Sequence, residues 1–292
     1  MRRRAPGRLA ALGLPAGSVL VVFGHFFFDR FDSSGFAVVL PEVQRSFHLS
    51  LSGITTLGAV SVMGAIVVAL PVSFASDARL PRVALLALAT AMAGAFCLVA
   101  GLMASVVAFA LARSGTAAGL RLSDPIQQSL LADYSPLERR PAVYSARELA
   151  NALGGLLGPA FFGAVAAAAS FRWALVAEAW PVLALAGVTL ALREPPRGAQ
   201  ERQAAGLSAE EAAEEEERPS WAEAWQRLQA VRSLRRVWYG VPFLVGGILA
   251  LGYLFPLYQA RVFGWGPAER GLVASLSQLF TMAGLVAGIP LA

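Results

Sequence analysis

Long apolar stretches and short polar ones alternate along the chain. Eight stretches dominated by Ala, Leu, Val and Gly cover residues 17–40, 51–74, 83–103, 106–132, 143–169, 173–192, 237–259 and 271–292. Each is close to the roughly 20 residues with which a helix crosses a bilayer. None shows the strict two-residue alternation of a barrel strand. The pattern therefore predicts eight membrane-spanning helices in an all-α polytopic membrane protein.

The composition excludes most soluble classes of protein. Hydrophobic residues occupy 57% and charged residues 15% of the 292 positions, whereas soluble domains carry about 25% charged residues. All 24 basic residues are Arg, but they lie scattered at the ends of the apolar stretches and form no stripe that would bind nucleic acid. The sequence has one cysteine, Cys97, and two histidines, so we expect no disulfide, no metal site and no cofactor.

The distribution of Arg predicts the orientation. Arg residues are frequent in the N-terminal arm, in the loops after the second and fourth stretches and in residues 193–236. The opposite loops carry only Arg45, Arg172, Arg261 and Arg270. Cytoplasmic loops hold the excess of positive charge, so we predict a multi-pass protein of the inner (cell) membrane with a cytoplasmic N-terminus.

A polar segment divides the chain into three parts. We predict a six-helix transmembrane bundle over residues 1–192, a cytoplasmic linker over 193–236 and the beginning of a second bundle over 237–292. The linker contains an acidic run, and then Ser220 and Glu223 in the spacing of a capping box. This spacing predicts a short amphipathic helix on the inner leaflet, with an irregular linker as the alternative.

The loop after the second stretch carries the first family motif. Residues 73–82 read Ser-Phe-Ala-Ser-Asp-Ala-Arg-Leu-Pro-Arg, and this run resembles the G-x-x-x-D-R-x-G-R-R motif of the major facilitator superfamily. Asp77 and Arg82 match, whereas the glycines are replaced. We expect Asp77 to cap the next helix and to pair with Arg82, and the resemblance implies that the loop is a latch on the inward-facing gate.

The end of the fourth stretch is similar to the same superfamily. Residues 129–140 resemble its loop between helices 4 and 5, with charged positions at Asp133, Glu138 and Arg139. The resemblance implies that these residues belong to the conformational machinery at the gate.

The fifth stretch carries a glycine motif. Residues 154–163 read Gly-Gly-Leu-Leu-Gly-Pro-Ala-Phe-Phe-Gly and resemble the G-x-x-x-G-P motif of antiporters, which matches at Gly154, Gly158 and Pro159. Glycine allows two helices to approach closely, and proline allows a kink. Ser145 stands where the longer motif has a further glycine.

The first stretch adds a subfamily resemblance. Asp29-Arg30, followed by Leu-Pro-Glu-Val-Gln at 40–44, is similar to a pattern of Spinster-like and some organic-anion members. The resemblance implies the major facilitator fold, with the first six-helix bundle and the first two helices of the second. Since the eighth stretch runs to Ala292 without a polar flank, we expect a chain truncated after helix 8, with about four spans missing.

Ionisable residues inside the spans mark the candidate chemistry, because each costs several kcal/mol in the bilayer. His25, Asp29 and Asp32 share one face of the first helix, and the fourth helix carries Arg113. We predict that Asp29 and Arg113 meet in a central cavity, where release of Arg113 to the substrate lets the acid bind a proton. Asp32 is an equal candidate for proton coupling, and His25 for relay. A static ion pair and a histidine bonded within the packing are the alternatives.

Four residues are candidates for binding the substrate: Arg113, Phe28, Phe36 and Glu178. Arg113 suits an anionic group, and the aromatic rings suit an amphiphile. The alternatives are ordinary packing for the two rings and an ion pair with Arg172 for Glu178.

These features predict a secondary active transporter that moves a small amphipathic or organic molecule by alternating access. We favour proton-coupled export, and the alternatives are proton-coupled uptake of an organic anion and a non-transporting membrane sensor or assembly protein. We predict no enzyme, because the sequence holds no P-loop, G-x-S-x-G or H-E-x-x-H motif. The predicted partners are the lipid bilayer, a small-molecule substrate and protons. We predict no nucleic-acid partner, and a monomer.

Overall fold

The computed structural model describes residues 16–79, 81–206 and 221–288, and these are helical with no strand. The predicted all-α class is therefore confirmed. The long helices are α1 (Ala16–Val38), α3 (Leu51–Arg79), α4 (Arg82–Leu102), α5 (Val106–Tyr134), α6 (Arg140–Ala168), α7 (Phe171–Thr189), α11 (Arg232–Val262) and α12 (Pro267–Gly288). The short ones are α2 (Leu40–Ser46), η2 (Leu137–Arg139), α8 (Ala199–Ala204) and α10 (Trp221–Ala230).

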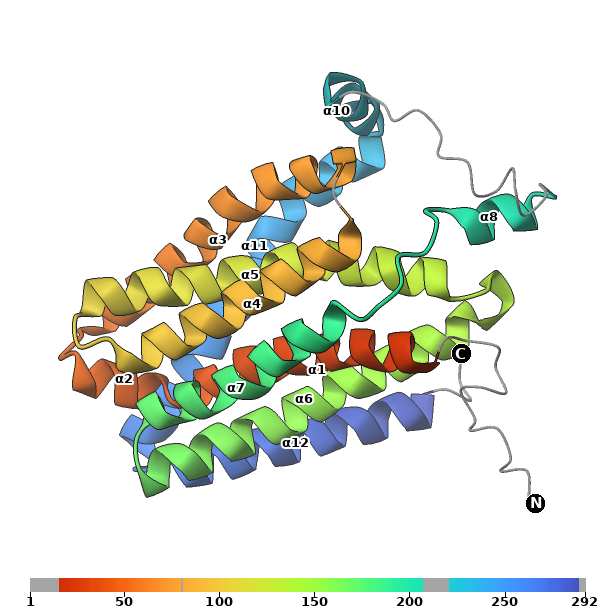
Figure 1. Cartoon of the computed structure of the whole chain (residues 1–292). Coiled ribbons are helices and arrows are strands. Elements are labelled where there is room, and N and C mark those ends of the chain that lie inside the picture. Colours follow the sequence, from red (N-terminus) through yellow and green to blue (C-terminus); the bar gives the residue numbers. More distant parts are fainter. Residues whose placement is uncertain (1–15, 80, 207–220, 289–292) are drawn as a thin grey trace, which may run out of the picture.

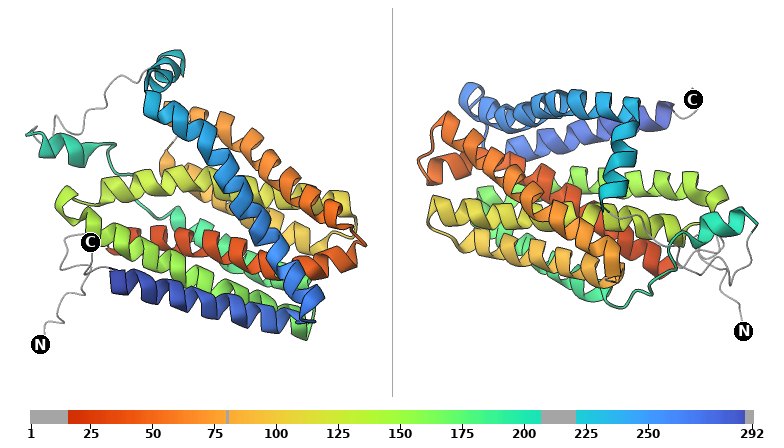
Figure 2. Two further views of the ribbon diagram at one scale, coloured as in Figure 1. Left: turned by 180° about the vertical axis from the view of Figure 1, so that it is seen from behind. Right: turned by 90° about the horizontal axis from the view of Figure 1, so that it is seen from above.

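The first six long helices form one bundle. Within it α1 packs against α6, α4 lies between α5 and α7, and α3 packs against α5. The last two helices lie on one side of this bundle: α12 runs along α6, and α11 crosses α2 and α3 (Figures 1 and 2). Each long helix matches one predicted apolar stretch. The short helix α2 is an addition, because the sequence reads there as a loop.

Length and hydropathy identify three of the described helical segments as long and apolar enough to cross a membrane. They are Arg82–Leu102, Leu137–Ala168 and Phe171–Thr189, and the bent pair Leu40–Ser46 and Leu51–Gly64, at 114°, adds a fourth if it counts as one span. Helix α1 is long enough, but it carries Asp29, Arg30 and Asp32. These three charged residues set α1 apart from the three segments, each of which contains an 18-residue stretch with at most two charged residues.

The distribution of burial is that of a membrane protein. Leu88, Leu111, Trp180 and Leu251 are all more than 60% exposed, whereas the ionisable side chains of the bundle interior are covered. An apolar exterior of this kind suits hydrocarbon rather than water. Two ends of the bundle are used as landmarks below: the Arg82 end, where α4 begins, and the Arg270 end, where α12 begins.

Candidate functional site

A buried ion pair joins α1 and α5 at the centre of the candidate site. Arg113 Nη1 donates to Asp32 Oδ1 at 2.9 Å, and Arg113 Nη2 donates to Asp32 Oδ2 at 3.0 Å. Both residues are 6% exposed. The expectation that Asp29 is the partner of Arg113 is therefore wrong. Asp32 lies one turn closer to the end of α1 at which α5 begins, so the guanidinium meets it first.

A second carboxyl group lies beside this pair. Glu178 of α7 is 1% exposed, and its Oε2 accepts a weak bond from the Cys97 thiol at 3.6 Å. Its Oε1 has no hydrogen-bond partner among the described residues. The alternative pairing with Arg172 is not seen, because Arg172 donates to the backbone carbonyl of Met103 instead.

The two acids and the thiol are close enough to interact. One ligand atom from each of Asp32, Cys97 and Glu178 lies within 4.8 Å of the others, a spacing that a metal ion can use. However, Arg113 is bonded to both oxygens of Asp32, and its positive charge opposes a cation there. The arrangement suits the sharing of a proton and a guanidinium between two carboxyl groups better than it suits a metal.

Asp29 has a different partner. Its Oδ2 accepts a hydrogen bond at 2.8 Å from Gln127 Nε2, which also donates to Ser123 Oγ at 2.9 Å. Gln127 is fully buried, and its Oε1 has no partner in the described structure. Gln127 was not predicted from the sequence, because an amide side chain in a helix is common.

His25 lies apart from the carboxyl groups. Its Nε2 lies 2.8 Å from Thr189 Oγ1, and its Nδ1 lies 3.1 Å from Thr90 Oγ1, so that it links α1 to α7 and α4. Both ring nitrogens are engaged by hydroxyl groups. This geometry matches the alternative of a histidine bonded within the helix packing.

The two candidate aromatic residues occupy different surroundings. The Phe36 ring centre lies 4.0 Å from Arg113 Cζ, in a cation–π contact that holds the guanidinium against α1. Phe28 lies in a cluster with Phe27 and Phe31, with ring centres 5.0 and 5.9 Å away. Phe36 therefore supports the ion pair, and Phe28 is partly exposed on the aromatic side of α1.

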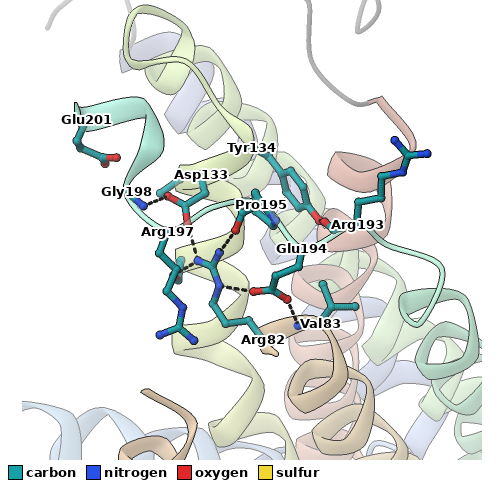
Figure 3. A network of polar contacts seen from close by, with 12 residues as sticks. Arg82, Val83, Asp133, Tyr134, Arg193, Glu194, Pro195, Arg197, Gly198 and Glu201 are labelled. Carbon is teal, nitrogen blue, oxygen red and sulfur yellow. Dashed lines mark hydrogen bonds and ion pairs between the residues drawn. The ribbon is translucent and has the colours of Figure 1, made fainter. Parts of the chain in front are cut away.

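A polar network closes the Arg82 end (Figure 3). Arg82 Nη1 donates to Asp133 Oδ2 at 2.5 Å and Arg82 Nε to Glu194 Oε1 at 2.8 Å. Its remaining donors reach Ser129 Oγ and the carbonyl of Pro195. The segment after α7 is thereby fastened to α4 and α5.

The acceptors of this network are also satisfied. Asp133 Oδ1 receives the Gly198 amide at 2.9 Å, and Glu194 Oε2 receives the Val83 amide at 2.9 Å. Glu194 thus caps α4 at its first turn, a role that we expected of Asp77. Among the described residues Arg82 pairs with Asp133 and Glu194, whereas the expected pairing with Asp77 falls on a side chain that lies outside them.

The other two charged positions of the predicted gate lie in η2. Glu138 is exposed, and Arg139 begins α6 as its N-cap residue. Arg140 next to them donates to Glu201 of α8 at 2.6 Å. Burial alone would raise the pKa of Glu201, but the bond from Arg140 holds this pKa below its ordinary value.

The glycine motif lies where α6 packs against α1 on one side and against α12 on the other. A Cβ atom on Gly154 would lie 2.2 Å from the Phe27 carbonyl oxygen, and one on Gly158 would lie 2.4 Å from the Phe31 carbonyl oxygen. On the other face of α6, the Pro159 carbonyl oxygen lies 2.4 Å from the place of a Cβ on Gly271 of α12. The absence of side chains therefore allows α6 to pack closely against α1, as the motif predicted, and against α12.

At the Arg270 end, α12 contacts the six-helix bundle. Arg270 of α12 is 1% exposed, and it donates to Glu42 Oε2 of α2 at 2.5 Å and to the Val38 carbonyl at 3.2 Å. The sequence analysis did not predict this contact, because Glu42 and Arg270 each read as a charged residue of a loop. The signal available was α2 itself, which begins at Leu40-Pro41 directly after α1.

Comparison with known proteins extends the picture. The family model described as the Major Facilitator Superfamily matches residues 22–292, and no curated protein matches the chain. A bacterial homologue of the human lysosomal transporter Spinster, inward-facing and unoccupied, aligns with a TM-score of 0.70 at 19% identity, over 94% of this chain and 62% of its own.

Two other solved structures are also similar. The xylose transporter XylE from E. coli, partially occluded and inward open, aligns with a TM-score of 0.62 at 16% identity, over 94% of this chain and 72% of its own. The peptide transporter POT in complex with sulfate aligns with a TM-score of 0.51 at 17% identity, over 98% of this chain and 55% of its own. At these identities the likeness shows the fold alone.

The chain spans 62% of the length of the Spinster homologue. The family match, by contrast, covers almost the whole chain, and the first six helices, the segment after α7 and two further helices occur in the order that the resemblance implied. The chain belongs to the major facilitator superfamily.

Proposed function

We propose that this protein is a secondary active transporter that exports a small amphipathic molecule in exchange for protons. The observation that carries the proposal is the buried pair of Asp32 and Arg113 with Glu178 beside it, whose Oε1 has no hydrogen-bond partner among the described residues. Ionisable residues are kept inside a membrane mainly where they serve transport. Members of this superfamily move small molecules across bilayers, and the named neighbours are transporters.

A charge count indicates how the site handles a proton. Asp32 and Glu178 together have two carboxyl groups, and Arg113 supplies one positive charge. One proton on either acid makes the group neutral, which is the cheapest state for buried charges. The site therefore holds one exchangeable proton and one guanidinium between two acids.

The exchange can be followed atom by atom. Arg113 donates two N–H bonds to Asp32, while Glu178 carries the proton. When a proton binds to Asp32, its carboxylate becomes neutral and its hold on Arg113 weakens. The guanidinium then turns to Glu178, whose proton leaves. This exchange moves a proton past the site, and it is coupled to transport if the two arrangements favour opposite orientations of the bundle.

The two ends of the bundle supply the conformational part of the proposal. The Arg270 end joins α12 to α2 and α1 through Glu42 and the Val38 carbonyl. Among the described residues, the Arg82 network joins α4, α5 and the segment after α7. Opening toward the Arg270 end requires that Arg270 leave Glu42, and we place this step after the exchange at Asp32.

Proton-coupled uptake of an organic anion is the second candidate, because Arg113 is a buried cation. In that case the anion must take Arg113 away from Asp32, since both Nη atoms are engaged there. Vesicles of opposite orientation distinguish the two: an imposed proton gradient drives cargo out of the cytoplasmic compartment for export and into it for uptake.

The test is transport by the protein in proteoliposomes with an imposed pH gradient. We expect Asp32→Asn and Glu178→Gln to lose gradient-driven accumulation by at least about tenfold while retaining exchange of labelled for unlabelled cargo. Glu148→Gln is the matched control, since Glu148 is exposed and pairs only with Arg147 in the described structure. Unchanged gradient-driven transport in both Asp32→Asn and Glu178→Gln would falsify the coupling role.

A further inference from the structure

Asp29 is an acid without a cation of its own. No Arg side chain lies within ion-pair distance of it among the described residues. Its one hydrogen bond comes from the neutral amide of Gln127, on Oδ2. Asp29 is partly exposed, and no hydrogen bond to its other oxygen, Oδ1, is seen among the described residues. An uncompensated carboxylate in the middle of a span is expensive unless a ligand supplies the charge.

Gln127 adds a second free acceptor to the same place. Its Nε2 is used twice, toward Asp29 and Ser123. Its Oε1 is buried and has no partner among the described residues, an arrangement that destabilises the structure unless a donor reaches it. The bonded pair of Asp29 and Gln127 therefore presents two acceptors and no spare donor.

The surrounding charges leave this place negative. The pair of Asp32 and Arg113 is neutral as a unit, and the remaining charged neighbours of Asp29 are Asp124 and Arg121, which offset each other. Arg30 follows Asp29 on α1 but lies against α6 and α12, next to Gly155 and Gln278. When it is ionised, the carboxylate of Asp29 is therefore the charge that these neighbours do not offset.

We propose that the cargo of this transporter is an amphipathic organic cation whose protonated amine donates to Asp29 and Gln127. The inference rests on the proposed function, and it names the substrate class. An ammonium group brings one positive charge and several N–H donors, which match one carboxylate and one amide oxygen. The partly exposed ring of Phe28, with Phe27 beside it on α1, offers an apolar and cation-attracting surface for the rest of the molecule.

Two other classes fit this place less well. A carboxylate would face Asp29 with a like charge, and it would have to compete with Asp32 for Arg113. A neutral alcohol could donate one bond but would leave the charge of Asp29 uncompensated. The amine is the class that satisfies both acceptors and the charge together.

Equilibrium binding tests the proposal without any gradient. The full chain is reconstituted in lipid nanodiscs, and three probes of the same shape are titrated in: 2-naphthylmethylamine, 2-naphthylmethanol and 2-naphthoate. We expect the amine to bind at least about tenfold more tightly than the alcohol and the carboxylate, a difference of about 1.4 kcal/mol. Asp29→Asn should remove this preference, Asp29→Glu should keep most of it, and Glu148→Gln should leave it unchanged.

The outcomes separate this proposal from proton coupling. Equal binding of the amine and the alcohol, tighter binding of the carboxylate, or no binding of any probe overturns the cation proposal even if gradient-driven transport depends on Asp32. Loss of the amine preference in Asp29→Asn supports it even if transport proves to need no proton. A preference that survives in Asp29→Asn, or that is lost equally in Glu148→Gln, also overturns it.

Discussion

Among the described residues, two groups place a buried arginine near two acids, and they differ in how completely their hydrogen bonds are satisfied. At the Arg82 end, the acids Asp133 and Glu194 receive the guanidinium and also a backbone amide each. In the central group, Arg113 is bonded to Asp32 alone. Glu178 beside them keeps a bare oxygen.

The difference separates a network that holds one conformation from a group that can change its hydrogen bonds. A buried polar group that is fully bonded fixes one conformation, because every change breaks bonds that nothing replaces. A group with an unfilled acceptor has a second arrangement of similar free energy, since the guanidinium or a proton can move to that acceptor. We therefore assign a structural role to the Arg82 network. We assign proton exchange to Asp32, Arg113 and Glu178.

The largest effect should come from breaking the complete network. Arg82→Ala leaves Asp133 and Glu194 without a cation, and we expect a loss of about 3–5 kcal/mol in the free energy of unfolding, as for other buried pairs that lose one partner. Denaturant titration in detergent micelles measures it. Arg45→Ala is the control, because Arg45 is an exposed partner of Glu42, and it should cost less than about 1 kcal/mol. Similar losses in both variants would contradict the assignment.

Breaking the central pair should cost less stability and more function. Arg113→Met leaves Asp32 buried without a cation, but Asp32 can bind a proton, so we expect a loss of about 1–3 kcal/mol that shrinks as the medium is acidified. Adding Asp32→Asn should recover most of it. Unfolding measured across a pH series for the single and double variants checks this; a loss as large as that of Arg82→Ala at every pH would show that the pair is only structural.

The two acids Glu178 and Glu194 offer a closer contrast. Glu194→Gln weakens the bond from Arg82 Nε and should cost about 1 kcal/mol. Glu178→Gln removes no ion pair in the described structure, and its amide oxygen can still accept from Cys97, so it should cost less than Glu194→Gln does. Thermal unfolding of both variants in nanodiscs decides it. A larger loss in Glu178→Gln than in Glu194→Gln would mean that the central acid is a fastening residue after all.

Much of the fold could be predicted, because the length and the apolar composition of a stretch are enough to identify a membrane helix. The eight stretches became eight long helices, and the glycines of α6 lie at close helix contacts. The exact pairing of Arg113 could not be predicted, since Asp29 and Asp32 lie on the same face of α1. Only the relative positions of α1 and α5 choose between them.

The polar network at the Arg82 end was missed for a similar reason. Arg82, Asp133 and Glu194 come from positions far apart in the sequence, and a motif names residues without naming their partners. The sequence favoured Asp77 because it is near Arg82 along the chain. In the described structure Arg82 is bonded by the segment after α7, where Glu194 closely follows an apolar span.

The smallest effect is expected at the edge of the Arg82 network, where Arg140 meets Glu201. Since the pKa of Glu201 is lowered from its ordinary value of 4.5, its bond stabilises the folded state above that pH and is lost as the pH falls through the lowered value. Thermal unfolding should therefore show wild type slightly more stable than Glu201→Gln at pH 7, and the gap should close once the pH has fallen below the lowered pKa of Glu201. The gap should also shrink in high salt, because Glu201 is 47% exposed. A gap that persists at low pH would place Glu201 with the buried acids rather than with the surface ones.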